Sequence, residues 1–129
     1  MQTCLVIDEF SVVRKIAGRI LSLTGYVAHS AETPEDAGPV MSSAGQIDIV
    51  IVSATLPGCA VEEAIRQVKA HPNARDAVIL ASLVEANLGL MTRAKRAGAK
   101  GFVYRPFDRA TLIEWLRAYA PERTTAAGA

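Results

Sequence analysis

Cysteine is scarce in this chain of 129 residues, and long apolar runs are missing. The two cysteines, Cys4 and Cys59, are too few for a disulfide-rich secreted scaffold. The first apolar stretch, residues 4–7, is far shorter than a signal peptide, and no window approaches the roughly 20 apolar residues of a membrane span. We therefore expect a soluble, cytoplasmic chain that contacts no membrane.

Positive and negative residues are nearly equal in number, but they are distributed unevenly along the chain. Residues 1–85 carry ten acidic and six basic residues, whereas residues 86–129 carry three acidic and eight basic ones. The basic second part is either a solvated helix surface or a docking face for an anionic partner. Because the net charge is only +1 and no appended effector domain is evident, we do not expect DNA binding.

Short apolar runs alternate with helical periodicity along the chain. Buried strands are expected at residues 4–7, 26–29, 47–52, 77–81 and 101–104. Helices are expected at about 12–23, 34–43, 60–70, 86–97 and 109–119. Five such repeats predict an α/β fold with an open, doubly wound, five-stranded parallel sheet. We assign residues 1–120 to this domain and expect a flexible tail at 121–129.

Polar residues at the predicted helix starts indicate how the helices begin. Ser11 is a plausible N-cap of the first helix, either Thr33 or Ser30 caps the second, and Asp108 caps the last. Gly38-Pro39 predicts that the second helix is short or irregular, because proline lacks an N–H donor.

Polar side chains follow four of the predicted strands. Asp8 and Glu9 follow the first, Ser53 the third, Ser82 the fourth and Arg105 the fifth. In an open doubly wound sheet, ligands bind at this edge, so these groups should converge on one pocket. Adjacent carboxylates there favour a divalent cation, or else they simply start the first helix through its dipole.

Four segments in order resemble the CheY-like family of response-regulator receiver domains over residues 3–119. They are LVIDE, DIVIVSATLPG, VILAS and AGAKGFVYRPF. The resemblance implies a (βα)5 flavodoxin-like fold with strand order 2-1-3-4-5. It also implies a role in bacterial two-component or phosphorelay signalling, in which a histidine kinase phosphorylates an Asp at the end of the third strand.

The sequence departs from the family pattern at that acceptor. Counting four residues back from Pro57 gives Ser53, and Asp48 lies at the beginning of the strand. A serine hydroxyl stays protonated without an adjacent base, and neither His29 nor His71 is placed to act as one. We therefore expect a degenerate receiver, or pseudo-receiver, with no catalytic residue of its own.

Other family positions are partly retained. Of the family's pair of metal-binding acids, Asp8 is kept and Glu9 replaces the other, while Thr55 would offer a backbone carbonyl. Because the carboxylate of the acceptor position is lost, Mg²⁺ binding by Asp8, Glu9 and Thr55 should be weak or absent. Ser82 and Phe102 occupy the two switch positions. Arg105 replaces the family lysine and is expected to pair with Asp8 or Glu9, mimicking one signalling state.

These features predict a stand-alone receiver that acts by phosphorylation-independent protein interaction, and not an enzyme. The interaction face would be the fourth helix, fifth strand and fifth helix, which carry Arg93, Lys95, Arg96, Lys100, Arg105 and Arg109 against Asp108. An acidic histidine kinase, scaffold or motor component would suit it. Alternatives are a cyclic-dinucleotide site at Arg93 and Arg96, and an ordinary phosphorylatable regulator with an unusual acceptor.

Overall fold

The computed structural model describes residues 1–119, and the predicted tail at 121–129 lies outside them. Strands and helices alternate strictly, apart from one short 3-10 turn, η1. The elements are β1 Thr3–Ile7, α1 Ser11–Leu23, β2 Val27–Ala31, α2 Pro34–Ala44, β3 Ile49–Ser53, α3 Val61–Lys69, η1 Pro72–Ala74, β4 Val78–Leu83, α4 Leu88–Ala97, β5 Gly101–Tyr104 and α5 Arg109–Tyr119. All four strand pairings are parallel, in the order β2-β1-β3-β4-β5. The predicted fold class and strand order are confirmed.

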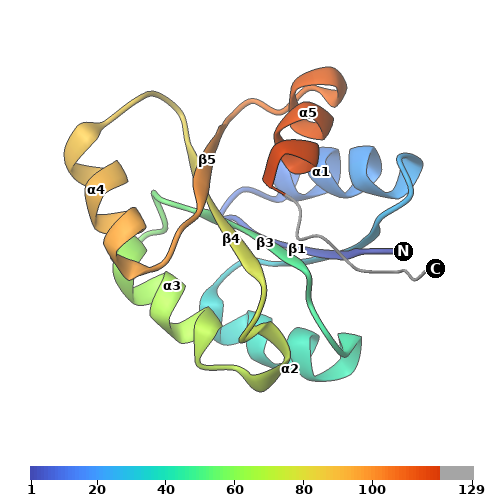
Figure 1. Ribbon diagram of the computed structural model, residues 1–129, viewed down its shortest axis with the longest axis horizontal. Helices are drawn as coiled ribbons and strands as arrows, with labels where there is room; N and C mark the ends of the chain where they lie inside the picture. The colour runs from blue at the N-terminus through green and yellow to red at the C-terminus, as the bar shows by residue number, and fades with distance from the viewer. Residues whose placement is uncertain (120–129) are drawn as a thin grey trace.

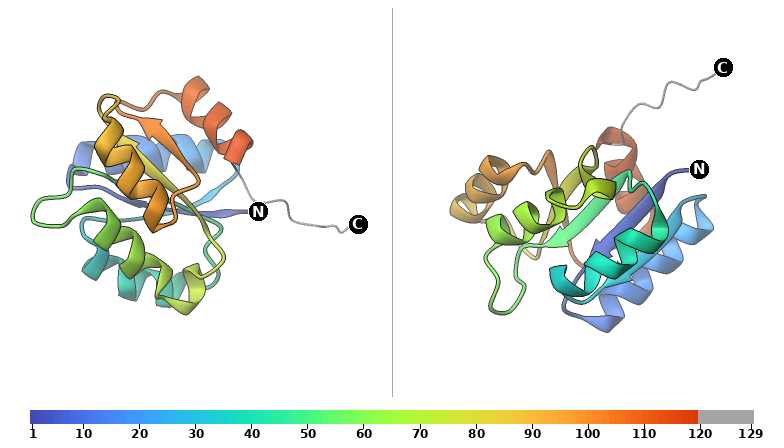
Figure 2. Two further views of the ribbon diagram at one scale, coloured as in Figure 1. Left: turned by 60° about the vertical axis from the view of Figure 1, so that its left-hand side comes forward. Right: turned by 90° about the horizontal axis from the view of Figure 1, so that it is seen from below.

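The sheet separates two layers of helices, with α1 and α5 on one face and α2, α3 and α4 on the other (Figure 1, Figure 2). Each face has its own hydrophobic core, since alternate residues of a strand point to opposite sides. Leu5 and Ile7 of β1 belong to the core beneath α2–α4, while Cys4 and Val6 belong to the core beneath α1 and α5.

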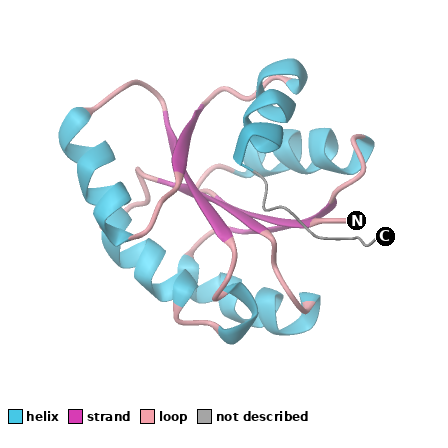
Figure 3. Cartoon of the chain, in the orientation of Figure 1, coloured by secondary structure: helices cyan, strands magenta, loops and turns pink. Residues whose placement is uncertain are grey.

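The central strands explain the continuous apolar runs in the sequence. All five residues of β3 are buried, because β1 and β4 flank it and helices cover both of its faces (Figure 3). The edge strand β2 has one buried residue, Ala31. A run of β-branched residues such as Ile49–Val52 suits a strand that is enclosed on both faces.

The helix starts agree with expectation in two of three cases. Thr33 accepts a hydrogen bond from the Asp36 N–H at 3.0 Å, and Asp108 accepts one from the Thr111 N–H at 2.9 Å. Ser11, however, is not an N-cap: it is the first helical residue of α1, and Phe10 holds the cap position without a side-chain hydrogen bond. The capping prediction at Ser11 was therefore wrong.

The second helix is longer and more regular than Pro39 suggested. It runs for 11 residues through that proline, at the cost of one backbone hydrogen bond. Ala37 and Met41 are buried on either side of Pro39, so the packing of this face offsets the lost bond. None of the helices in the described part of the chain is long and apolar enough to cross a membrane.

Candidate functional site

The carboxyl ends of β1, β3, β4 and β5 bring four predicted residues to one buried place. Ser53 and Ser82 are direct partners in the register of β3 and β4, while Asp8 follows β1 and Arg105 follows β5. All four are buried, and Asp8 is only 1% exposed. A carboxylate at that depth requires a positive partner or strong hydrogen bonds.

Arg105 is that partner, and it contacts residues at the ends of three other strands, β1, β3 and β4. Its Nη1 lies 3.4 Å from Asp8 Oδ2 and 3.8 Å from Glu9 Oε1. Its Nη2 donates to Thr55 Oγ1 at 2.9 Å and to the Ser82 carbonyl oxygen at 3.4 Å. The predicted guanidinium–carboxylate contact is present, with both acids of the pair. The peptide bond between Arg105 and Pro106 is cis.

The hydroxyl of Thr55 joins these groups into one network. It donates to Glu9 Oε2 at 2.7 Å and accepts from Arg105, and it lies 3.1 Å from Ser53 Oγ. Since the only proton of Thr55 Oγ1 goes to Glu9, the Ser53 hydroxyl donates in the remaining bond. Ser53 Oγ in turn accepts from the Thr55 N–H at 3.1 Å.

Thr55 is the residue whose importance the sequence did not reveal. The family resemblance implied a use for its backbone carbonyl only, whereas here its side chain holds Ser53, Glu9 and Arg105 together. Its position two residues after Ser53, in the loop that ends a buried strand, was the available signal.

The two carboxyl groups differ in their pKa shifts. Burial raises the pKa of Asp8, and the Phe10 N–H at 2.9 Å and the Arg105 charge only partly oppose this. Burial also acts to raise the pKa of Glu9, but hydrogen bonding outweighs it, with Thr55 first and the Arg105 charge as the smallest contribution, so that the pKa of Glu9 is lowered. Glu9 is therefore held as a carboxylate.

The predicted cation set of Asp8, Glu9 and Thr55 does not fit a divalent ion. The Arg105 guanidinium already lies against both carboxylates and supplies the positive charge that a metal would bring. A hydroxyl stands where a third carboxylate would be needed, at Ser53. Within residues 1–119, no group of three or more His, Cys, Asp or Glu side chains is placed to hold a metal ion.

Asp48 and the two histidines, all within the described residues, are not placed to assist Ser53. Asp48 is at the opposite end of β3, where its carboxylate accepts from the Thr3 N–H at 2.7 Å. His29 lies on the edge strand β2. The His71 ring forms hydrogen bonds with the Ser42 hydroxyl and the Asn73 N–H. Asp48 therefore serves the start of the sheet and not the site.

The two predicted switch residues lie on neighbouring strands beside the site. Ser82 is buried, and its Oγ has no hydrogen-bond partner among the described residues. Phe102 on β5 is half-buried and packs against the core beneath α2–α4. The buried atoms Glu9 Oε1 and Arg105 Nε also lack hydrogen-bond partners within residues 1–119, although Glu9 Oε1 is near Arg105 Nη1.

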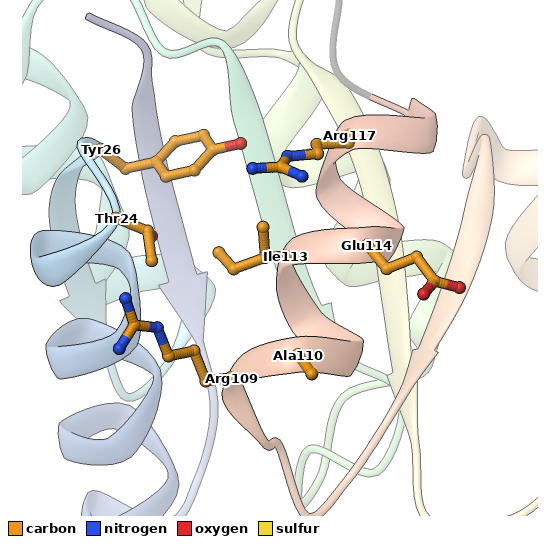
Figure 4. Close-up of a pocket in the computed structure, with 7 residues that line it drawn as sticks. All are labelled: Thr24, Tyr26, Arg109, Ala110, Ile113, Glu114 and Arg117. Atoms are coloured by element: carbon orange, nitrogen blue, oxygen red, sulfur yellow. The ribbon is translucent and has the colours of Figure 1, made fainter.

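Fewer basic side chains lie on the predicted interaction face than the sequence indicated. Arg105 is withdrawn into the buried site, and Arg109 lines a pocket between α1, β2 and α5 (Figure 4). Arg93, Lys95, Arg96 and Lys100 remain exposed on and after α4; we call them the α4 basic patch. Arg93 also lies 3.9 Å from Glu62 of α3.

The two cysteines differ in environment. Cys4 is fully buried in β1, and this burial, followed by the charge of Asp48, raises the pKa of its thiol to about 12. Burial and the charges of Glu35 and Glu63 raise the pKa of the Cys59 thiol, which remains partly accessible.

Comparisons with known proteins agree with this architecture. The sequence pattern of the response regulator receiver domain matches residues 4–117. The chemotaxis protein CheY of Pseudomonas aeruginosa is 28% identical over 111 residues, which cover 85% of this chain and 89% of that protein. CheY-3 of Vibrio cholerae is 27% identical over 113 residues, which cover 87% and 86%.

Solved structures give the same fold. CheY4 of Vibrio cholerae superimposes with a TM-score of 0.84 at 22% identity, over 92% of this chain and 98% of that one. The receiver domain of the sensor histidine kinase PA1611 of Pseudomonas aeruginosa, which holds a coordinated magnesium ion, gives 0.76 at 23% identity, over 92% and 96%.

Proposed function

Because this chain belongs to the response regulator receiver family of two-component signalling, we propose that it is a receiver that works without phosphorylation, by protein interaction at the face of α4, β5 and α5. Family members are typically signalling modules and not catalysts, and we assign this chain no reaction. The proposal rests on one observation above all: the Arg105 guanidinium contacts Asp8, Glu9 and Thr55.

This contact supports the proposal because a side chain of the protein itself balances the negative charge of the two carboxylates. The network already contains its cation, at Arg105, and its acceptor position is the hydroxyl of Ser53. At the acceptor position an incoming phosphoryl group would meet the neutral hydroxyl of Ser53, and the Arg105 guanidinium already lies against both carboxylates. We infer that the input has been replaced by a fixed ion pair that holds the domain in one state.

The α4 basic patch supports an acidic partner. Lys95, Arg96 and Lys100 are exposed and make no ion pair within residues 1–119, so their charge is available to a partner. Val84 and Leu88, 65% and 78% exposed, lie in the chain just before and at the start of α4. Apolar area beside positive charge suits an acidic surface of a histidine kinase, scaffold or motor component.

The first test is the intact mass of the protein after incubation with acetyl phosphate and Mg²⁺. We expect the native protein to gain no phosphoryl group. A variant with Ser53→Asp, Glu9→Asp and Arg105→Lys together should gain one that is labile to hydroxylamine, because it restores an acyl phosphate site. A phosphoryl group on the native chain would contradict the proposal and favour an ordinary regulator with an unusual acceptor.

The second test concerns the partner face. Lys95→Glu/Arg96→Glu should reduce the capture of partners from a lysate of the source cells, and the loss should be reproduced by raising the salt concentration. The matched control is Lys15→Glu/Arg19→Glu, which reverses two exposed charges on α1, across the sheet. Equal effects of both pairs would argue against a specific role for α4.

A second candidate function is supported by a shallow pocket beside α4. Arg93 and Arg96 line it together with Asn87 and Thr92, as their spacing of three residues on one helix predicts. Such a guanidinium pair suits the phosphates of a cyclic dinucleotide. Titration with cyclic di-GMP, comparing Arg96→Ala with native protein, tests this; an unchanged melting temperature would remove it.

A further inference from the structure

A second pocket lies on the other side of the sheet, away from α4. It is formed where the turn between α1 and β2 meets α5, and its volume is about 720 Å³. None of its lining residues belongs to the network around Arg105 or to the α4 basic patch. That volume falls within the usual range for small-molecule sites.

Two arginines of α5 border this pocket. Arg109 and Arg117 are eight residues apart, which places their backbones about 12 Å apart along the helix. Figure 4 shows both guanidinium groups on the side of α5 that faces α1 and β2, whereas Glu114 extends away from them. Neither arginine is paired with a carboxylate among residues 1–119.

An apolar floor lies between these charges. Ile113 is half-buried in the middle of the pocket, and the ring of Tyr26, the residue just before β2, lies opposite it (Figure 4). Burial raises the pKa of Tyr26, while the nearby charge of Arg117 acts to lower it. The pocket therefore offers an aromatic ring and an apolar surface between two arginines that form no ion pair within residues 1–119, with the carboxylate of Glu114 at its border.

We propose that this pocket binds a nucleoside polyphosphate. Guanidinium groups bind phosphate oxygens through paired, charge-assisted hydrogen bonds, and a polyphosphate chain carries enough oxygens to engage such donors. A nucleobase can stack on the ring of Tyr26 or on a guanidinium plane, with Ile113 beneath it. A single carboxylate is too short to use two guanidinium groups spaced along a helix. The site is independent of the function proposed above.

The test is calorimetric titration of the full chain with ATP and with GTP, without divalent cations, because the arginines supply the positive charge. Inorganic tripolyphosphate and adenosine serve as the two halves of the ligand. We expect ATP or GTP to bind more tightly than either half. Arg109→Ala and Arg117→Ala should each weaken binding roughly tenfold or more, since each removes charged hydrogen bonds.

Controls separate this site from the rest of the molecule. Arg96→Ala removes an arginine of the pocket beside α4 and should leave the affinity unchanged, and Tyr26→Phe should retain it where Tyr26→Leu does not. No binding at about 1 mM nucleotide would overturn the proposal. The proposal would also be overturned if neither α5 variant changed the affinity, or if Arg96→Ala abolished binding. Tripolyphosphate binding as tightly as ATP would overturn the assignment of a nucleoside.

Discussion

The guanidinium of Arg105 lies 3.4 Å from the carboxylate of Asp8, although 97 residues separate them in the chain. Both side chains are almost fully buried, at 4% and 1% exposure. In such a place each charge depends on the other, because water is excluded from both. The ends of β1 and β5 are thus joined by an internal ion pair.

Removing Arg105 should therefore be costly. We expect Arg105→Met to lower the free energy of unfolding by about 3 kcal/mol, since it leaves Asp8 as an unpaired buried acid. The double variant Arg105→Met/Asp8→Asn should recover part of the loss. Urea denaturation measures both. As a control, Arg93→Met removes an exposed pair with Glu62 and should cost less than about 1 kcal/mol. Equal costs for the two arginines would contradict this account.

Stability should respond to pH through Glu9 and Asp8 with opposite signs. The folded pKa of Glu9 is lowered, so its ionised form stabilises the fold above the ordinary glutamate pKa of about 4.3, and this stability is lost as the pH falls through the lower folded pKa. Glu9→Gln should therefore lose less stability than native protein upon acidification.

Asp8 should show the reverse. Its folded pKa is raised above the ordinary aspartate value of about 3.9, so its contribution is most favourable at low pH and is lost as the pH rises through the folded pKa. Relative to Asp8→Asn, native protein should gain stability on acidification. Urea midpoints from pH 7 to about pH 3 test both residues. Variants that shift in the same direction would contradict the assigned shifts.

Two glycines should respond to alanine in opposite ways. Gly18 lies inside α1, and a methyl group added there would meet no atom within 4 Å, so Gly18→Ala should stabilise the fold by about 0.5–1 kcal/mol. At Gly101 an added methyl group would overlap the Tyr119 ring. Because the overlapping atoms are the outer end of an exposed ring that can move away, Gly101→Ala should displace Tyr119 and cost no more than about 1 kcal/mol.

Thermal unfolding measures both changes. If the clash with the ring is the cause, Gly101→Ala should cost less in a Tyr119→Ala background than in the native one. A Gly101→Ala variant as stable as native protein, with Tyr119 unmoved, would be inconsistent with this packing.

The two thiols should react differently in the folded protein. Iodoacetamide should modify Cys59 once, slowly, because its raised pKa leaves little thiolate at neutral pH. Cys4, with its pKa raised to about 12 by burial, should react only after unfolding. Mass spectrometry with and without urea counts the adducts, and Cys59→Ser serves as the control. Native labelling of Cys4 would show that β1 opens readily.

Most of the fold could be predicted from the sequence. Strand–helix alternation and continuous apolar runs such as Ile49–Val52 arise from local periodicity and burial on both faces, which the order of residues records directly. The polar residues that follow the strands were also identifiable, since parallel strands bring their carboxyl ends to one edge. Five predicted strand–helix units, a parallel sheet and the convergence of Asp8 with Arg105 all follow from these rules.

Other features depended on the packing of distant segments. The apolar residues of α1 do not all face the sheet: Val12, Ile16 and Leu23 are exposed. The docking of α1 buries Ala17 and Leu21 and packs Val13 and Ile20 against the core. The network of Thr55 and the withdrawal of Arg105 from the basic face required three loops to meet. Sequence determines which side chains are available, but only the tertiary structure decides which distant groups lie within hydrogen-bonding distance.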